Sequence, residues 1–363
     1  MTKIGLVIKG HEGKSQYWNA NVKPFVDLSY GLQSIGEEPV LFIDDSQRHL
    51  DEKINSIIQD KVHKIYFHQS CLEKLISESG VKYLVVDDNA ELMKSILQFR
   101  NIGFKKAVFV QYLFGVNTNK RDKRVGSVAL TIGSYIPWKL LIRQYRNLLL
   151  GFDYVIPNSQ TCGYVLRQFY DIMPTGTVYP PVGLDMKPFL DSFNTSNEKS
   201  GLLIFAGNII NDHFSRNLSE EIRELKSKLG EPVRLFVSNS ETAISFSQIG
   251  IELYSNLPVS ELVQLYSKSR ITYIPTTYEL FGYVGAESLL CGTPVILDVY
   301  HPFLESVPMQ TNAVRIAHPK SKILNVFFQI MNDNADVEAA KNSIVNRYSP
   351  EESARSLLRA MEI

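Results

Sequence analysis

The chain has 363 residues, 44% of them hydrophobic and 21% charged, which is typical of a globular protein with room for two domains. Lysines plus arginines and aspartates plus glutamates number 38 each, which argues against a protein built around a general polyanion-binding field. Three cysteines without CxxC spacing, Cys71, Cys162 and Cys291, indicate buried thiols in a reducing cytosol rather than disulfides or a zinc site. The N-terminal apolar run is too short for a signal peptide, and no stretch approaches the roughly 18 apolar residues of a membrane span. We therefore expect a soluble, cytoplasmic protein.

The first half of the chain alternates short apolar segments with amphipathic ones. The apolar segments predict strands at 3–8, 38–44, 64–68, 82–88 and 106–115. The amphipathic segments predict helices at 22–36, 71–79 and 90–101. Strands that alternate with helices in this way indicate a doubly wound parallel sheet.

A second series of the same kind follows. Its strands are predicted at 202–207, 233–238, 251–255, 271–276 and 293–298. The Pro180–Pro181 pair and a polar stretch at 193–201 mark a linker between the two series. We expect an N-terminal Rossmann-like domain at 1–180, a linker at 181–200 and a C-terminal Rossmann-like domain at 201–345. We expect a final helix at 346–363 that begins at Ser349-Pro350 and could pack back on the first domain. Two such domains facing a central cleft place ligands at the carboxyl ends of their strands.

The segment YELFGYVGAESLLCGTPVIL at 278–297 predicts a binding site. Glu279 follows the strand 271–276, and Gly282 permits a tight turn before a helix that opens around Phe281–Tyr283. The amino end of that helix suits an anion such as a diphosphate. Glu287 stands about one turn inside, among apolar residues, where a partly buried carboxylate needs donors such as the hydroxyls of a ribose. Gly292 is expected to end the helix.

This segment resembles the E-x7-E signature of glycosyltransferase family 4, whose members are retaining enzymes of the GT-B fold. The likeness extends to NLPVSELVQLYSKSRITYIPT at 256–276, FDYVIPNSQ at 152–160 and TVYPPVGLD at 177–185. It covers roughly residues 150–363 well and the N-terminal half only in general plan.

The resemblance implies roles for individual residues. Glu287 would bind the ribose of a nucleotide-sugar, and Glu279 would contact the transferred sugar and stabilise positive charge at its anomeric carbon. The backbone from Leu280 to Tyr283 would hold the diphosphate, and Asn256 and Leu257 would lie against the base. The implied donor-binding set is Gly10, Gly207, Asn208, Arg216, Asn256, Leu257, Glu279, Leu280, Phe281, Gly282, Tyr283 and Glu287. The implied catalytic set is Glu279, Arg216 and His11, with no metal and no cofactor.

The chain departs from the family pattern after the strand 202–207. Asn208 stands where the family usually has an arginine, and Arg216 is the best substitute for a lysine that normally follows. Arg216 is equally consistent with a surface arginine in a loop. These departures keep open a pseudo-enzyme that binds a nucleotide-sugar without transferring it.

The acceptor half is less informative. His11 either assists an acceptor or phosphate or is an ordinary loop histidine, and a Walker A motif is excluded because Ile8 stands where a glycine is required. Gln111 and Tyr112 occupy the place of a histidine that many relatives carry. We interpret Asp87-Asp88 as capping at a strand end.

Two basic segments of the acceptor half could meet an anionic partner. The loop 117–124 carries Lys120, Arg121, Lys123 and Arg124, which suit an anionic acceptor or, more commonly, form a solvated charge run. The basic amphipathic segment 134–152 suits a membrane surface, although packing on its own domain is favoured.

The favoured function is therefore a metal-independent retaining glycosyltransferase that moves a sugar, preferably from a UDP-sugar, to a hydroxyl of a cell-surface glycan or a lipid-linked precursor. A natural product is the next acceptor, and a modified nucleic-acid base is a minority alternative. Contact with a membrane surface and with nucleic acid both remain open.

Overall fold

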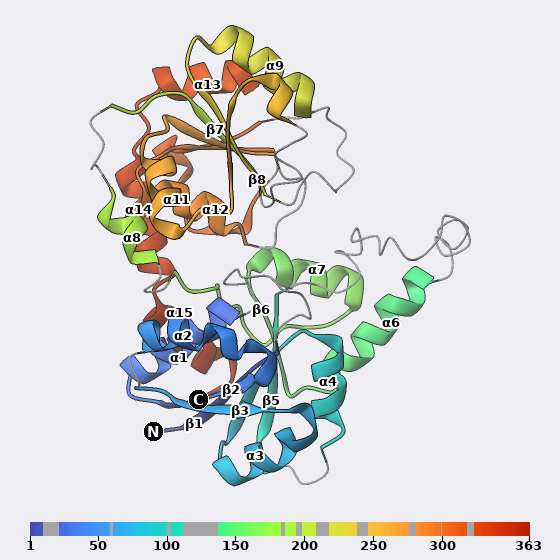
Figure 1. Cartoon of the computed structure of the whole chain (residues 1–363). Coiled ribbons are helices and arrows are strands. Elements are labelled where there is room, and N and C mark those ends of the chain that lie inside the picture. The colour runs from blue at the N-terminus through green and yellow to red at the C-terminus, as the bar shows by residue number, and fades with distance from the viewer. Residues whose placement is uncertain are drawn as a thin grey trace. The chain divides into compact units, whose positions relative to one another are not determined.

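A computed structural model of the chain describes residues 1–9, 22–58, 61–99, 103–111, 137–182, 186–193, 198–207, 218–237, 246–275, 281–298, 300–317 and 323–363. The chain forms two compact units (Figure 1). Unit 1 comprises Met1–Leu184 together with Tyr348–Ile363, and unit 2 comprises Asp185–Arg347.

Unit 1 is built on a parallel sheet. Its described strands, in the order β3-β2-β1-β4-β5-β6, are all paired in parallel. They are β1 (Lys3–Ile8), β2 (Glu38–Asp44), β3 (His63–Phe67), β4 (Tyr83–Asp87), β5 (Lys105–Val110) and β6 (Tyr154–Pro157). The predicted strands are confirmed within a few residues at their ends, except that residues 112–115 of the strand predicted at 106–115 lie outside the described ranges. Strand β6 is an addition that the sequence pattern did not predict.

Helices cover both faces of this sheet. They are α1 (Val22–Ser34), α2 (Asp51–Ile58), α3 (Leu72–Ser79), α4 (Ala90–Leu97), α6 (Pro137–Leu149), α7 (Gln160–Tyr170) and α15 (Pro350–Ala360), with short 3₁₀ helices at Asp45–Leu50 and Gln69–Cys71. The basic segment forms α6, which packs on α4 and α7 and buries Tyr145 and Leu149. Its Arg146 donates to the carbonyl of Tyr170 at 2.7 Å. For its described side chains, the favoured prediction that this helix packs on its own domain is correct.

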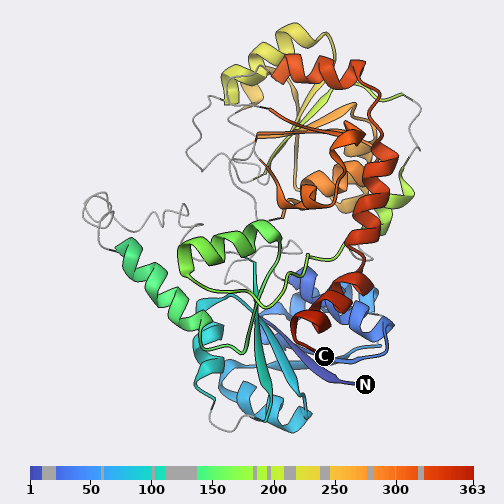
Figure 2. The same cartoon turned by 180° about the vertical axis from the view of Figure 1, so that it is seen from behind.

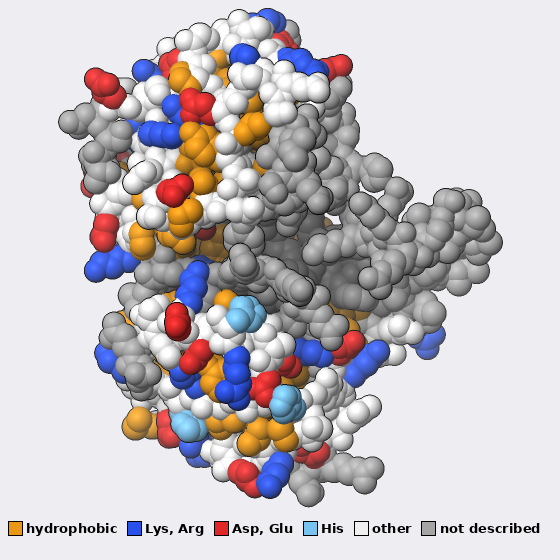
Figure 3. Space-filling view, viewed as in Figure 1, with side chains coloured by type: hydrophobic (Ala, Val, Ile, Leu, Met, Phe, Trp, Pro, Cys, Tyr) orange, Lys and Arg blue, Asp and Glu red, His pale blue; other side chains and the backbone are white. Residues whose placement is uncertain are grey.

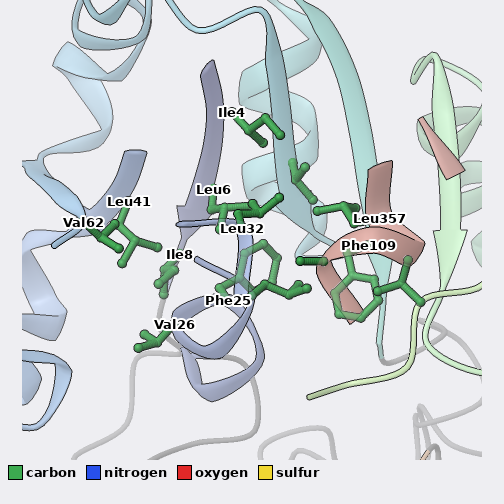
Figure 4. Close-up of a cluster of buried hydrophobic side chains, with 14 of the residues drawn as sticks. Ile4, Leu6, Ile8, Phe25, Val26, Leu32, Leu41, Val62, Phe109 and Leu357 are labelled. Atoms are coloured by element: carbon green, nitrogen blue, oxygen red, sulfur yellow. The ribbon is translucent and has the colours of Figure 1, made fainter. Parts of the chain in front are cut away.

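The core of unit 1 joins the two ends of the chain. Side chains from β1 and α1, such as Leu6 and Phe25, meet Phe109 of β5 and Leu357 of α15 (Figure 4). Gly31 allows α1 to lie close to the start of α15, because a Cβ at this position would lie 2.0 Å from the carbonyl oxygen of Pro350. Both termini consequently lie close together in this unit (Figure 2).

Helix α15 begins where the sequence indicated. Ser349 is its N-cap and accepts a hydrogen bond from the backbone N–H of Glu352 at 3.2 Å, with Pro350 as the first helical residue. The hydroxyl of Ser353 donates to the carbonyl of Tyr179 at 3.0 Å. The bond from Ser353 attaches the last helix to a segment of unit 1 far from it in the sequence.

Unit 2 repeats the plan. Its described strands follow the order β12-β11-β10-β7-β8-β9, again in parallel. They are β7 (Leu202–Gly207), β8 (Val233–Val237), β9 (Glu252–Ser255), β10 (Ile271–Ile274), β11 (Val295–Leu297) and β12 (Val314–Ile316). The predicted strands are confirmed, and β12 is a further strand that the sequence pattern did not predict.

The helices of unit 2 are α8 (Lys187–Asp191), α9 (Leu218–Leu229), α11 (Val259–Ser267), α12 (Tyr283–Leu290), α13 (Ile323–Asn332) and α14 (Val337–Arg347), with 3₁₀ helices at Ser247–Ile249, Pro302–Glu305 and Met309–Thr311. Helices α9 and α13 pack together on one face of the sheet (Figure 1). The stretch 181–200, expected as a linker, contains α8. This helix packs on α11 and α12 within unit 2, because Phe189 is buried against the ring of Tyr266.

The charges on the surface are mixed, as the balanced composition predicted, and two of the three thiols are buried. On the face seen in Figure 3, basic and acidic side chains of the described residues are interspersed. Cys162 and Cys291 are buried as expected, whereas Cys71 is half-exposed because it lies in a surface 3₁₀ turn. Within the described ranges, no helix is long and apolar enough to cross a membrane, and no cluster of three or more His, Cys, Asp or Glu residues is placed to hold a metal ion.

Candidate functional site

The candidate site lies at the carboxyl edge of the unit 2 sheet. Strands β7 and β10 are neighbours, and the chain runs outward from β7 through β8 to β9, and from β10 through β11 to β12. The strand order therefore reverses between β7 and β10, which is where open α/β sheets bind ligands. Gly207 ends β7, and the chain that leaves β10 at Ile274 leads to α12. Both features of the predicted donor site thus belong to this edge.

Helix α12 opens as the sequence predicted. Gly282 is its N-cap with a φ of +98°, a conformation that favours glycine, and the helix begins at Tyr283. The carbonyl of Gly282 accepts from the N–H of Gly285 at 3.1 Å. The turn is fixed from outside by the N–H of Phe303, which donates to the carbonyl of Phe281 at 2.9 Å. The N–H groups of the first helical turn consequently point along the axis toward the carboxyl edge of the sheet.

Glu287 stands in the middle of α12 and is half-buried, as expected from its apolar neighbours. The hydroxyl of Tyr266 in α11 donates to its Oε2 at 3.2 Å. Burial and the nearby charge of Glu287 raise the pKa of Tyr266 well above its usual value, so this hydroxyl remains a donor. A carboxylate has about four acceptor positions, so it can accept further donors from a ligand.

Tyr266 is itself held firmly. Its ring stacks on Phe205 of β7 with centroids 6.1 Å apart and an interplanar angle of 6°. The carbonyl of Tyr266 accepts from the hydroxyl of Thr293 at 2.9 Å. Ser288, the neighbour of Glu287, donates to the hydroxyl of Thr272 in β10 at 2.8 Å. These buried bonds fix the orientation of α12 against the sheet and thereby the position of the Glu287 carboxylate.

The other end of α12 is capped by a lysine that sequence reasoning missed. Gly292, with a φ of +74°, ends the helix as predicted. The ammonium of Lys199 lies 2.5 Å from the carbonyl oxygen of Gly292, 3.3 Å from that of Cys291 and 2.9 Å from the hydroxyl oxygen of Thr293. A cation at this end also complements the helix dipole. Lys199 lies in the polar stretch that suggested a linker, so no pattern in the sequence marked it.

His301 is a second residue that sequence reasoning missed. It follows β11 and is 1% exposed, and neither ring nitrogen has a hydrogen-bond partner among the residues that the structure describes. Burial lowers its pKa to about 4, so the ring is neutral at pH 7. Its Nδ1 lies 2.7 Å from the position that a Cβ on Gly282 would occupy. A lone histidine in the stretch HPFLE carries no periodicity, and only the fold brings it to the start of α12.

The remaining predicted donor residues lie in different circumstances. Asn256, exposed and with a φ of +53°, and Leu257 form the turn between β9 and α11, as the sequence suggested. Several other predicted residues fall outside the described ranges: Gly10, His11, Tyr112, Lys120, Arg121, Lys123, Arg124, Asn208, Arg216, Glu279 and Leu280. The structure therefore places Gly282 as the N-cap of α12 and Tyr283 and Glu287 within that helix, and the binding roles of all the predicted residues stay predictions.

Unit 1 has a polar group at the corresponding edge of its own sheet. Asp87 ends β4 beside β1, and its carboxylate accepts from the N–H of Asn89 at 3.1 Å, which matches the predicted capping. Asp88 accepts from the buried hydroxyl of Tyr145 at 2.9 Å. Burial, reinforced by the charge of Asp88, raises the pKa of Asp87 to about 8. The pair is thus buried more deeply than simple capping requires.

Comparison with known proteins supports the fold. No protein-family model matches the chain, and no curated protein matches it. Solved structures do match over nearly the whole length. Sucrose-phosphate synthase from Thermosynechococcus elongatus is 15% identical with a TM-score of 0.70, covering 100% of this chain and 98% of that one. A glycosyltransferase from Rickettsia africae is 14% identical with a TM-score of 0.67, covering 99% and 98%. Anabaena HepE, solved in complex with UDP, is 12% identical with a TM-score of 0.64, covering 100% of both chains.

The chain has the GT-B fold. Its two parallel α/β units match those of the glycosyltransferase structures, and the predicted fold class is confirmed. HepE has also been solved in complex with UDP-glucose, at 11% identity and a TM-score of 0.63.

Proposed function

We propose that the protein is a retaining glycosyltransferase that moves a sugar from a nucleotide-sugar, preferably a UDP-sugar, to a hydroxyl acceptor. The observation that carries the nucleotide-sugar part of this proposal is the arrangement of α12, and retention of configuration is proposed on the resemblance to family 4. Its first turn opens on Gly282 at the carboxyl edge of the unit 2 sheet, and Glu287 is held one turn further by Tyr266. The GT-B fold and the UDP complexes of HepE support the same ligand class.

The chemistry follows from these groups. The N–H groups at the start of α12 and its dipole stabilise the diphosphate and the negative charge that it gains on leaving. Glu287 accepts hydrogen bonds from the ribose hydroxyls with its remaining acceptor positions. By resemblance to family 4, Glu279 orients the sugar and stabilises the positive charge of the anomeric carbon. Because the helix dipole and the backbone N–H groups stabilise the negative charge of the leaving diphosphate, the proposed reaction requires no metal or cofactor.

The acceptor is proposed on the family resemblance alone, as a glycan or a lipid-linked precursor. The basic residues of the loop 117–124 motivate a nucleic-acid acceptor as the alternative. Salt-dependent binding of duplex DNA would favour that alternative, and absence of binding at low salt would remove it.

A binding protein without transfer activity is a second candidate, because Asn208 replaces the expected arginine. Two measurements separate the candidates. A thermal-shift panel of UDP, GDP, ADP and their sugars identifies the nucleotide, since a ligand that binds only the folded state raises the melting temperature. Release of nucleoside diphosphate from the stabilising sugar nucleotide then tests for turnover. We expect release by the wild type and none by Glu279→Ala; a wild type that binds the donor without any release would leave only the binding function.

A further inference from the structure

We propose that His301 is a phosphate-binding residue of the nucleotide site, where a ring nitrogen donates a hydrogen bond to the diphosphate held at the start of α12. This inference rests on the proposed function, because it takes the first turn of α12 as the diphosphate site. It adds a side-chain donor from a segment after β11 that no resemblance assigned.

The position of the imidazole is the first argument. Its Nδ1 faces Gly282, the residue from which α12 opens, and lies 2.7 Å from the position of a Cβ there. Any side chain at position 282 would stand between the ring and the helix end. The glycine therefore serves two purposes, since it permits the positive φ and leaves room for the imidazole against the N-cap of α12.

The imidazole is costly to the fold in its present surroundings. His301 is 1% exposed, and its nitrogens have no hydrogen-bond partner among the described residues. A buried polar group in this state destabilises a fold, and an apolar ring of similar shape would avoid the cost. The ring of Phe303 packs edge-to-face against it at 6.1 Å between centroids and carries no oxygen or nitrogen that could accept from the imidazole. An unpaired buried group of this kind calls for an explanation, and a bound ion that completes the hydrogen bond is one.

The chemistry of the ligand is the third argument. Burial lowers the pKa of His301 to about 4, so at pH 7 the ring is neutral and one nitrogen carries a proton that it can donate. A phosphate oxygen is a strong acceptor, and a hydrogen bond to a charged group in a dry site is stronger than one between neutral groups. The imidazole thus complements the backbone donors of α12 without adding a fixed charge to the ligand-free site.

The test compares two replacements at this position. His301→Phe keeps a planar ring against Gly282 and Phe303 but removes both nitrogens, and His301→Gln keeps an N–H donor. His63→Phe is the matched control, because His63 is exposed on β3 in unit 1. Calorimetry measures the affinity of each variant for whichever of UDP, GDP and ADP the wild type binds, ligand-observed NMR measures the corresponding nucleoside, and thermal unfolding measures the ligand-free proteins.

We expect His301→Phe to bind the diphosphate roughly 10- to 100-fold more weakly, the loss of one hydrogen bond to a charged group, with unchanged affinity for the nucleoside. Its ligand-free melting temperature should equal or exceed that of the wild type. His301→Gln should stay within a few-fold of the wild type, and His63→Phe should match it. Wild-type diphosphate affinity in His301→Phe, or equal loss of diphosphate and nucleoside, would overturn the inference. If the wild type binds none of the three diphosphates, the proposed function fails, and inorganic pyrophosphate becomes the probe. Pyrophosphate binding that His301→Phe weakens would still support the phosphate site, whereas absent or unchanged binding would overturn it.

Discussion

Replacing Lys199 by methionine should loosen the helix that carries the candidate site. The ammonium of Lys199 donates to the carbonyls of Cys291 and Gly292, directly after the last residue of α12, and to the hydroxyl of Thr293, at 2.5 to 3.3 Å. Burial lowers its pKa to about 8, so the ammonium is still charged at pH 7. Methionine keeps an unbranched stem of similar length in the same pocket and removes only the charge and its donors.

The magnitude follows from what the substitution leaves behind. Two carbonyls at the end of a helix lose a charged donor, which costs about 1 kcal/mol each, and the lost cation–dipole interaction adds about 0.5 kcal/mol. Methionine also relieves the desolvation that lowers the pKa of the ammonium, which offsets part of this cost, so we expect a loss of roughly 1 to 2 kcal/mol in the free energy of unfolding of unit 2. For a unit of this size, that loss lowers the melting temperature by roughly 2 to 8 °C.

Urea and thermal unfolding measure the loss, and amide hydrogen exchange locates it. Exchange should accelerate in the last turn of α12 and at residues 291–293, while β1 and α15 of unit 1 remain protected. Lys228→Met is the control, because Lys228 forms only an exposed i,i+4 pair with Glu224 and should change stability by less than about 0.5 kcal/mol. If the Lys199 variant were as stable as the control, with unchanged exchange in α12, the capping argument would be refuted.

Three further outcomes are expected. Gly282→Ala should cost at least about 2 kcal/mol and weaken UDP binding, because a Cβ there meets a ring nitrogen at 2.7 Å and φ is +98°, whereas Gly36→Ala, at a φ of +91° in open space, should cost only about 1 kcal/mol. Thermal unfolding and UDP titration measure both. Glu287→Gln should weaken the binding of UDP about 10-fold in calorimetry. An unchanged affinity would exclude Glu287 from the nucleotide site. The raised pKa of Asp87 means that the folded state holds a proton that the unfolded state releases between about pH 4 and pH 8. Stability should therefore fall as pH rises through this range, and urea unfolding of Asp87→Asn should lack that slope.

The sequence predicted those parts of the fold in which local pattern and tertiary structure agree. Apolar runs such as KIGLVI and LLIFAG are long enough to indicate buried parallel strands, and both form as expected. Strand β12 has only three residues with Arg315 at its centre, and β6 has only four and ends in a proline, so both are shorter than the runs that mark the other strands. Helix α7 contains Gly163, a residue that weakens the helical pattern of the sequence. In the fold this glycine allows the helix to approach Pro157 closely.

In the candidate site, too, the features set by local sequence were predicted and those set by tertiary contacts were not. Three features depend only on the order of residues within one segment, and all three were predicted. They are the turn at Gly282, the partial burial of Glu287 and the end of the helix at Gly292. Lys199 and His301 act on that segment from outside it. Their contacts to α12 arise only when β7 and β11 lie in one sheet, and no spacing in the sequence encodes this proximity.

The two ends of α12 are built for different purposes. At the carboxyl end, Gly292 and Lys199 satisfy the last carbonyls within the protein. At the amino end the N-cap is a glycine, which has no side chain to accept from the first N–H groups, and the first turn carries no acidic residue. Helices α4, α7 and α15 have Asn89, Ser159 and Ser349 in that place, and each accepts from a backbone N–H of its own first turn. An acidic or hydroxyl cap at position 282 would compete with an anionic ligand for the same donors, so its absence favours binding at the expense of helix stability. The bonds of Lys199, Ser288 and Tyr266 offset that expense elsewhere on the helix, which allows its amino end to remain positively polarised without fraying.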